Sequence, residues 1–144
     1  MLYTDLTKKA MKICFEAHKN QRDKDGLPYV FHPFHVAEQM ETEEEICTAL
    51  LHDVVEDSDW TLDRLAAEGF PFSVLEALSL LTHNDDTPYL EYVARLKGNP
   101  IAAAVKRADL EHNSMPGRLT KMTKRDLERL EKYRRAREIL TEKE

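Results

Sequence analysis

A run of ionisable side chains interrupts the most apolar stretch of this 144-residue chain. Residues 46–51 are almost entirely apolar, and the next six residues read His-Asp-Val-Val-Glu-Asp. If one helix continues through both segments, His52, Asp53, Glu56 and Asp57 fall within an arc of roughly 140°. Burying ionised groups is costly unless they are paired or bind a metal. The pattern therefore predicts a helix that directs an imidazole and three carboxylates at one point, as a metal-centred hydrolytic site requires.

The rest of the sequence predicts an all-α protein that folds as a single helical bundle over residues 1–144. Its 42% hydrophobic and 33% charged content is typical of a globular chain, and four glycines and six prolines are few. No stretch has the alternating pattern of a strand. Apolar spacing and capping residues predict helices over residues 4–19, 33–40, 43–57, 61–67, 71–81, 88–97, 101–112 and about 123–141.

Charge is distributed unevenly along the chain, whose net charge is −6. Residues 1–117 carry 11 Lys and Arg against 21 Asp and Glu, whereas residues 118–137 carry 9 against 3. An acidic chain is not expected to bind nucleic acid. The basic stretch, which includes the C-terminal helix expected at about 123–141, could reach a phosphate ligand or a partner. It could equally be a solvated helix face with pairs such as Glu128 and Lys132.

Two features bear on where the chain works. Cys14 and Cys47 are its only cysteines, and both lie in apolar helical stretches, which favours buried free thiols in a reducing cytoplasm. No apolar run is long enough to cross a membrane, and the first residues do not resemble a secretory leader. We therefore expect a cytoplasmic protein without a membrane partner.

Two further segments could complete a metal site. His32 precedes His52 by 20 residues at a junction between a loop and a helix, and Asp109 lies on an apolar helix with Asn113 one turn later. With Asp53 they form a mixed imidazole and carboxylate set. Such a set suits Mn²⁺, Fe²⁺ or Zn²⁺ better than Ca²⁺ and leaves positions open for water and substrate. A divalent ion there would lower the pKa of bound water and polarise a phosphoryl oxygen.

Each of these residues also has an ordinary structural interpretation. Asp109 could simply pair with Lys106 or Arg107, and Glu56 with Asp57 could form a solvated helix end. The joint pattern of an early His, a His-Asp pair, a Glu-Asp pair and a distant Asp favours the metal site. Glu56 would then lie one turn from His52, where it could transfer a proton.

Three motifs resemble those of the HD superfamily of metal-dependent phosphohydrolases, and most closely the hydrolase domain of the RelA/SpoT alarmone enzymes. Residues 26–33 read Gly-x-Pro-Tyr-x-x-His-Pro, residues 50–57 read Leu-Leu-His-Asp-Val-Val-Glu-Asp, and residues 106–113 read Lys-x-Ala-Asp-x-x-His-Asn. The resemblance extends over about residues 10–119. Because no synthetase domain fits after that point, the architecture is similar to the short, stand-alone alarmone hydrolases.

The resemblance implies a single HD-domain helical bundle with a defined metal site. It implies that Mn²⁺, or another divalent transition metal, is held by His32, His52, Asp53 and Asp109. It implies that Glu56 and Asp57 are catalytic, through water activation and proton transfer. The implied substrate is a small nucleotide, guanosine tetra- or pentaphosphate, which loses its 3′-pyrophosphate.

The segments that would contact the nucleotide differ from the family pattern. Asp23 and Lys24 stand where the family usually has Arg-Lys, and Arg22 is displaced by one position. Ser114-Met115-Pro116 stands where the family has Met-Arg-Thr. We expect Lys24, Arg22 and Asn113 to bind substrate and the Asp23 carboxylate to repel phosphates. Two alternatives stay open: a phosphohydrolase for another nucleotide, and a slow domain that senses a nucleotide.

Overall fold

The computed structural model describes residues 1–119 and 121–142, and within these ranges the protein is helical. The helices are α1 (Asp5–His18), α2 (Phe31–Glu38), α3 (Glu43–Leu51), α4 (Val54–Asp57), α5 (Leu62–Ala67), α6 (Phe72–Leu81), α7 (Tyr89–Leu96), α8 (Pro100–Asn113) and α9 (Lys124–Thr141). Extended pairing among the described residues is limited to one isolated bridge between Arg22 and Pro28. The predicted all-α class is confirmed.

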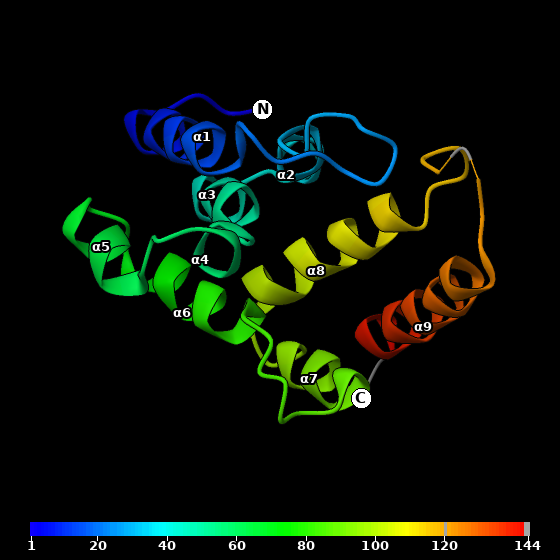
Figure 1. The fold of residues 1–144 in the computed structure, drawn as a ribbon. Helices are drawn as coiled ribbons and strands as arrows, with labels where there is room; N and C mark the ends of the chain where they lie inside the picture. The colour runs from blue at the N-terminus through cyan, green and yellow to red at the C-terminus, as the bar shows by residue number, and fades with distance from the viewer. Residues whose placement is uncertain (120, 143–144) are drawn as a thin grey trace.

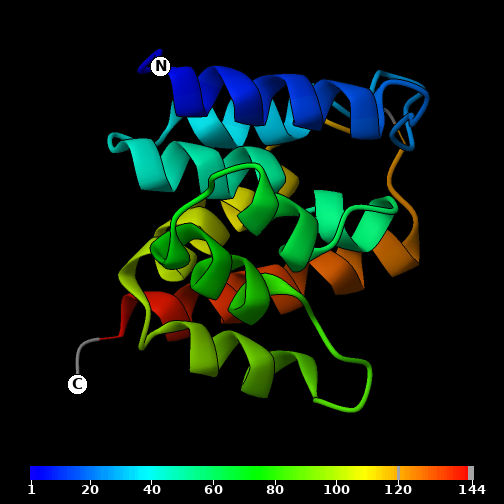
Figure 2. The same ribbon diagram turned by 90° about the vertical axis from the view of Figure 1, so that its left-hand side faces the viewer.

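The helices pack in layers around α8 (Figure 1). Helices α1, α2 and α3 pack together at one end of the molecule, and α7 and α9 lie at the other (Figure 2). Helix α8 runs between them and contacts α2, α3, α6, α7 and α9. The core draws fully buried leucines from distant parts of the chain: Leu50, Leu51, Leu65, Leu78, Leu96 and Leu110. The C-terminal end of α3, at His52, is thereby fixed next to Asp109 of α8.

Capping residues determine where several helices begin. Thr4, Thr42 and Thr123 each accept a hydrogen bond from the backbone three residues later, and each forms a reciprocal capping box. Asn99 caps α8, and Pro100 occupies its first turn. Such caps contribute typically about 1 kcal/mol each, because they satisfy backbone donors that have no partner inside the helix. The predicted starts of α3 at Thr42 and of α9 at Thr123 are confirmed.

The prediction of one continuous helix over residues 43–57 is wrong. Helix α3 ends at Leu51, a turn at His52 and Asp53 follows, and α4 begins only at Val54. Asp53 has φ −105° and ψ −5°, outside regular helical geometry. The ionisable residues of this segment therefore do not share one helical face. None of the helices in the described ranges is long and apolar enough to span a membrane.

Candidate metal centre and substrate cavity

Three of the predicted ligands converge from three helices. His32 lies in the first turn of α2, His52 caps α3, and Asp109 lies on α8. One ligand atom from each lies within 4.8 Å of the other two, and all three side chains are buried. Asp109 Oδ1 lies 2.7 Å from His32 Nε2 and 3.5 Å from His52 Nε2. Both imidazoles therefore face the same carboxylate oxygen of Asp109.

The orientation of His52 fits a bound cation. Its Nδ1 lies 2.5 Å from the carbonyl oxygen of Ala49 and donates to it, which leaves Nε2 as the free ring nitrogen. That Nε2 is buried and has no well-directed hydrogen bond within the described chain, although Asp53 Oδ2 is 3.1 Å away. A lone pair that faces carboxylate oxygens in a buried site is unfavourable. A divalent ion between them would turn the same arrangement into a ligand set.

The pKa values at the centre report the same demand for positive charge. Burial by itself lowers the pKa of His52, but the carboxylates of Asp53 and Asp109 raise it well above its ordinary value. Burial raises the pKa of Asp53, yet the neighbouring His52 brings it down to about 2. Both aspartates are thus ionised at neutral pH. The carboxylates around His52 therefore favour a positive charge at this point, and a divalent ion would supply it.

Asp53, the fourth predicted ligand, lies beside the group of three rather than within it. Its Oδ2 accepts a hydrogen bond from the hydroxyl of Tyr29. Burial is the main cause that raises the pKa of Tyr29, and Asp53 adds to it, so the phenol stays protonated as a donor. Direct ligation by Asp53 stays a prediction.

Lys106 neutralises the other side of Asp109. Its Nζ lies 3.0 Å from Asp109 Oδ2, and only 14% of its side chain is exposed. Burial alone would lower the pKa of Lys106, but the Asp109 carboxylate raises the pKa by more than burial lowers it, so the ammonium is retained. Burial raises the pKa of Asp109, whereas Lys106 and the two histidines hold it well below its ordinary value. The pairing of Asp109 with Lys106 therefore exists together with the metal group and does not replace it.

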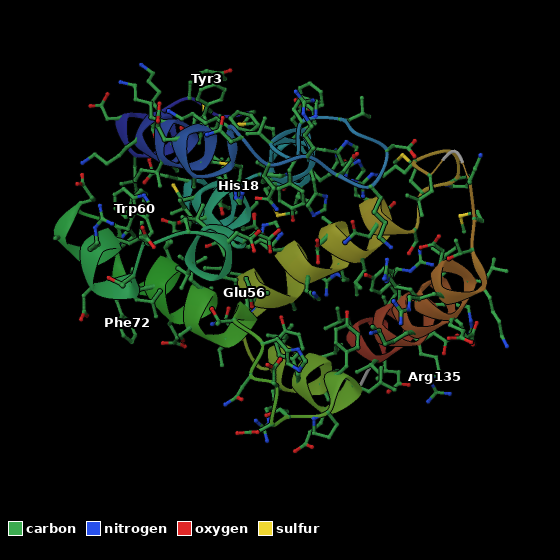
Figure 3. All side chains as sticks on the ribbon, viewed as in Figure 1. Tyr3, His18, Glu56, Trp60, Phe72 and Arg135 are labelled. Carbon is green, nitrogen blue, oxygen red and sulfur yellow. The ribbon has the colours of Figure 1, made fainter. Side chains whose placement is uncertain are left out.

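A cavity of about 200 Å³ opens beside the candidate metal centre, and Glu56 forms part of its wall. Its walls are His52, Asp53, Glu56, Leu81, His83, Tyr89, Tyr92, Val105, Lys106 and Asp109. Glu56 extends from α4 (Figure 3) and shares the cavity wall with Leu81 of α6 and Val105 of α8. Its Oε1 accepts the backbone N–H of His83 at 2.9 Å. Glu56 is therefore held beside the ligands, where a proton-transfer group would be needed.

Asp57 lies on another side of α4 and does not line this cavity. It borders a hollow formed with Glu16, Asn20 and Gln21, and Gln21 Nε2 donates to its Oδ2 at 3.4 Å. Burial, followed by the charge of Asp53, raises its pKa. Glu56 and Asp57 are neighbours on α4 but border different hollows, so the predicted part of Asp57 in proton transfer stays a prediction.

A second cavity, of about 290 Å³, holds the three predicted substrate-binding residues. Arg22, Lys24 and Asn113 line it together with Tyr29, Arg118, Leu119, Asp126, Arg129, Leu130 and Tyr133. Asn113 donates to Asp109 Oδ1 at 3.2 Å and thus connects the cavity to the candidate metal centre. The cavity combines aromatic and aliphatic walls with several cations, as a nucleotide site requires.

Known proteins resemble the chain in sequence and in fold, although no family model matches it. The guanosine-3′,5′-bis(diphosphate) 3′-pyrophosphohydrolase MESH1 of Danio rerio is 39% identical over 84 residues, which cover 53% of this chain and 46% of that protein. MESH1 of Mus musculus is 34% identical over 114 residues, which cover 69% of this chain and 63% of that protein. The resemblance predicted from the three motifs is confirmed. This chain spans about half to somewhat under two thirds of the length of these relatives.

The fold has a counterpart among solved structures. A metazoan ortholog of SpoT, described as hydrolysing ppGpp, matches with a TM-score of 0.79 over 98% of this chain and 88% of that chain. The sequences are 20% identical over the match, so the likeness concerns the fold. The helical bundle expected from the motifs is therefore the observed architecture, and its fold is like that of the SpoT ortholog.

Sequence reasoning missed the role of Arg118 opposite Asp23. Asp23 Oδ1 accepts the backbone N–H groups of Asp25 and Leu27, so its carboxylate holds its own loop. Its Oδ2 lies 3.9 Å from Arg118, which also donates to Asn113 Oδ1 at 2.7 Å. The expected repulsion of phosphates by Asp23 is thus offset by a cation across the cavity. The only sequence signal for Arg118 was its place at the start of the basic stretch.

Helix α9, which contains most of the basic stretch, also faces the second cavity. Arg129 and Tyr133 line its wall, and Lys24 Nζ lies 3.0 Å from Asp126 Oδ1. The ammonium of Lys132 lies 4.6 Å from the centre of the Tyr89 ring. One face of α9 therefore belongs to the candidate substrate site, which favours the phosphate-ligand interpretation of the basic stretch over a wholly solvated helix.

Proposed function

We propose that this protein is a divalent-metal-dependent phosphohydrolase that removes the 3′-pyrophosphate from guanosine 3′,5′-bis(diphosphate). The observation that carries the proposal is the convergence of His32, His52 and Asp109 beside Glu56 and a cation-lined cavity. The named activity of the MESH1 relatives supports the same substrate. We propose that the described helices, which pack around α8, act as one HD-type domain.

We propose Mn²⁺ as the ion, with other divalent transition metals as possible substitutes. His32, His52 and Asp109 would hold it, and Asp53 would be the fourth ligand after a small movement of its carboxylate. When bound, such an ion lowers the pKa of water and polarises a phosphoryl oxygen. The mixed nitrogen and oxygen donors fit this choice better than a set of oxygens alone, which would suit Ca²⁺.

The residues of the chain provide orientation and proton transfer. Water attacks the phosphorus that is bonded to ribose O3′, the P–O3′ bond breaks, and O3′ takes up a proton, so that the products are pyrophosphate and guanosine diphosphate. Glu56 is positioned to accept the proton of the attacking water, because it lines the cavity of the centre and its other contact is a backbone N–H. Lys106 keeps Asp109 ionised throughout.

The larger cavity would hold the nucleoside and its 5′-diphosphate. Tyr29 and Tyr133 offer faces on which a base can stack, and Arg22, Lys24 and Arg118 offer charge for phosphates. Asn113 joins this cavity to the centre and would orient the ribose end. We propose that the protein works in the cytoplasm, where its buried free thiols, Cys14 and Cys47, would stay reduced.

The same geometry also supports a phosphohydrolase for another nucleotide. Asp23 is committed to its own loop and to Arg118, so the wall that would recognise the base differs from the family pattern. A slow sensor domain is favoured less, because Glu56 is retained beside the ligands.

The test is to offer the Mn²⁺-loaded protein a panel of nucleotides and to separate the products by chromatography. Guanosine 3′,5′-bis(diphosphate) should yield guanosine diphosphate and pyrophosphate, and both chelation and His52→Ala should abolish the reaction. Rapid hydrolysis of a different nucleotide would replace the proposed substrate by that nucleotide. No turnover of any member of the panel would contradict the enzymatic proposal.

A further inference from the structure

The ring of His112 lies against the outer edge of His32. The Nδ1 atoms of the two rings are 2.7 Å apart, and the ring planes differ by 6°. On its other side His112 stacks on His35, with centroids 3.9 Å apart and planes 18° apart. His112 lies on α8, one turn after Asp109, whose carboxylate points into the metal centre. The Nε2 atom of His32 faces that carboxylate.

The hydrogen bond between two Nδ1 atoms restricts how the protons are arranged. A neutral imidazole carries one N–H and one lone pair, so one ring must donate and the other must accept. If His32 presents the lone pair of Nε2 to a metal ion, its single hydrogen is on Nδ1. His112 must then accept through its own Nδ1 and carry its hydrogen on Nε2. The 2.7 Å separation is consistent with a bond of this kind.

The comparison with His52 shows why His32 needs such a partner. His52 donates from Nδ1 to the carbonyl oxygen of Ala49, so the backbone fixes its tautomer. For the Nδ1 of His32, the partner observed in the described chain is a side chain, that of His112. The partner of the second nitrogen commonly determines which nitrogen of a histidine binds a metal, and how strongly.

We propose that His112 is a positioning residue that holds His32 in the tautomer with hydrogen on Nδ1 and directs its Nε2 at the divalent ion. The inference rests on the proposed function, because it requires that His32 is a metal ligand. The stack with His35 fixes the plane of the His112 ring, so the accepting lone pair stays in line with the His32 N–H. His112 itself does not touch the ion.

Binding of Mn²⁺ to metal-free protein, measured by isothermal titration calorimetry, tests this role without any activity assay. His112→Phe keeps the stack but removes the acceptor, and we expect Mn²⁺ affinity to fall by roughly 10- to 100-fold. His112→Gln restores an acceptor oxygen and should recover most of the loss. His35→Phe preserves a stacked ring without touching His32, and it serves as the matched control with affinity close to that of the parent. Circular dichroism reports that each variant is folded.

Two results would overturn the positioning role while leaving the proposed function intact. One is parental Mn²⁺ affinity in His112→Phe, and the other is an equal loss in His112→Phe and His112→Gln. Absence of Mn²⁺ binding by the parent would instead contradict the proposed function itself, and the inference with it. ¹⁵N NMR of the Zn²⁺-loaded parent needs no variant. It should find the His32 hydrogen on Nδ1, and a hydrogen on Nε2 would overturn the proposal.

Discussion

Replacing Lys106 by methionine should destabilise the metal-free protein strongly, because it leaves Asp109 buried without its ammonium partner. The two charges lie 3.0 Å apart, with 14% and 8% of their side chains exposed. At an effective dielectric constant of about 20, this separation corresponds to an attraction of roughly 5 kcal/mol. Removal of one partner of a buried pair typically costs roughly 3–5 kcal/mol. We therefore expect Lys106→Met to lower the free energy of unfolding by about that amount at pH 7.

The loss should depend on pH with a defined sign. The pKa of Asp109 in the folded protein is well below its ordinary value, so the ionised carboxylate stabilises the fold above the unfolded pKa. That stabilisation disappears as the pH falls through the folded pKa. Without Lys106 the folded pKa of Asp109 rises, and the carboxylate can take up a proton in mild acid. The difference between parent and variant should therefore be largest near neutrality and smaller towards pH 4.

Urea denaturation followed by circular dichroism, with a chelator present, measures both effects. Lys19→Met is the matched control, since Lys19 forms a pair of the same i,i+3 spacing with Glu16 at 2.8 Å, on the surface. That exposed pair is expected to contribute less than about 1 kcal/mol. Equal costs for the two substitutions, or a cost of Lys106→Met that does not change between pH 7 and pH 4, would show that Lys106 does not stabilise the fold through the charge of Asp109.

Two further predictions concern the catalytic and substrate residues. Glu56→Ala should keep the fold and Mn²⁺ binding but lower turnover by about 10²-fold or more, whereas His52→Ala should lose both the metal and activity. Steady-state kinetics with metal titration separates the two variants, and a fully active Glu56→Ala protein would exclude proton transfer by Glu56. Asp23→Asn keeps an oxygen for the backbone donors of its loop and removes the charge opposite Arg118. It should lower KM for the nucleotide, and an unchanged or higher KM would mean that Arg118 does not contact the substrate.

Much of the fold could be predicted because the signals that start a helix lie within a few residues of each other. The capping boxes at Thr42 and Thr123 determine helix starts through bonds that span three residues, so spacing alone reveals them. The apolar helix around Asp109 was equally visible. The mutual approach of His32, His52 and Asp109 was inferred from residue type and from family resemblance, because packing of α2, α3 and α8 against one another is not encoded in any short window.

The break after α3 could not be predicted from periodicity. The apolar spacing of residues 46–55 is compatible with one helix, and the turn at His52 and Asp53 depends on tertiary contacts: Tyr29 donates to Asp53, and Asp109 lies beside His52. Periodicity also did not indicate that Glu56 and Asp57, neighbours on α4, would border different hollows. Arg118 was missed for a similar reason, since only the folded chain brings it across from Asp23.

The proposed metal centre is tested most simply by the position of a manganese ion in a crystal of the protein grown with Mn²⁺. Anomalous scattering at the manganese edge locates the ion. We predict one strong peak within bonding distance of His32 Nε2, His52 Nε2 and Asp109 Oδ1. A carboxylate oxygen of Asp53 at the same peak would establish the fourth ligand. A crystal grown with Mn²⁺ that shows no peak among these side chains, or shows the ion bound elsewhere, would contradict the proposed metal centre.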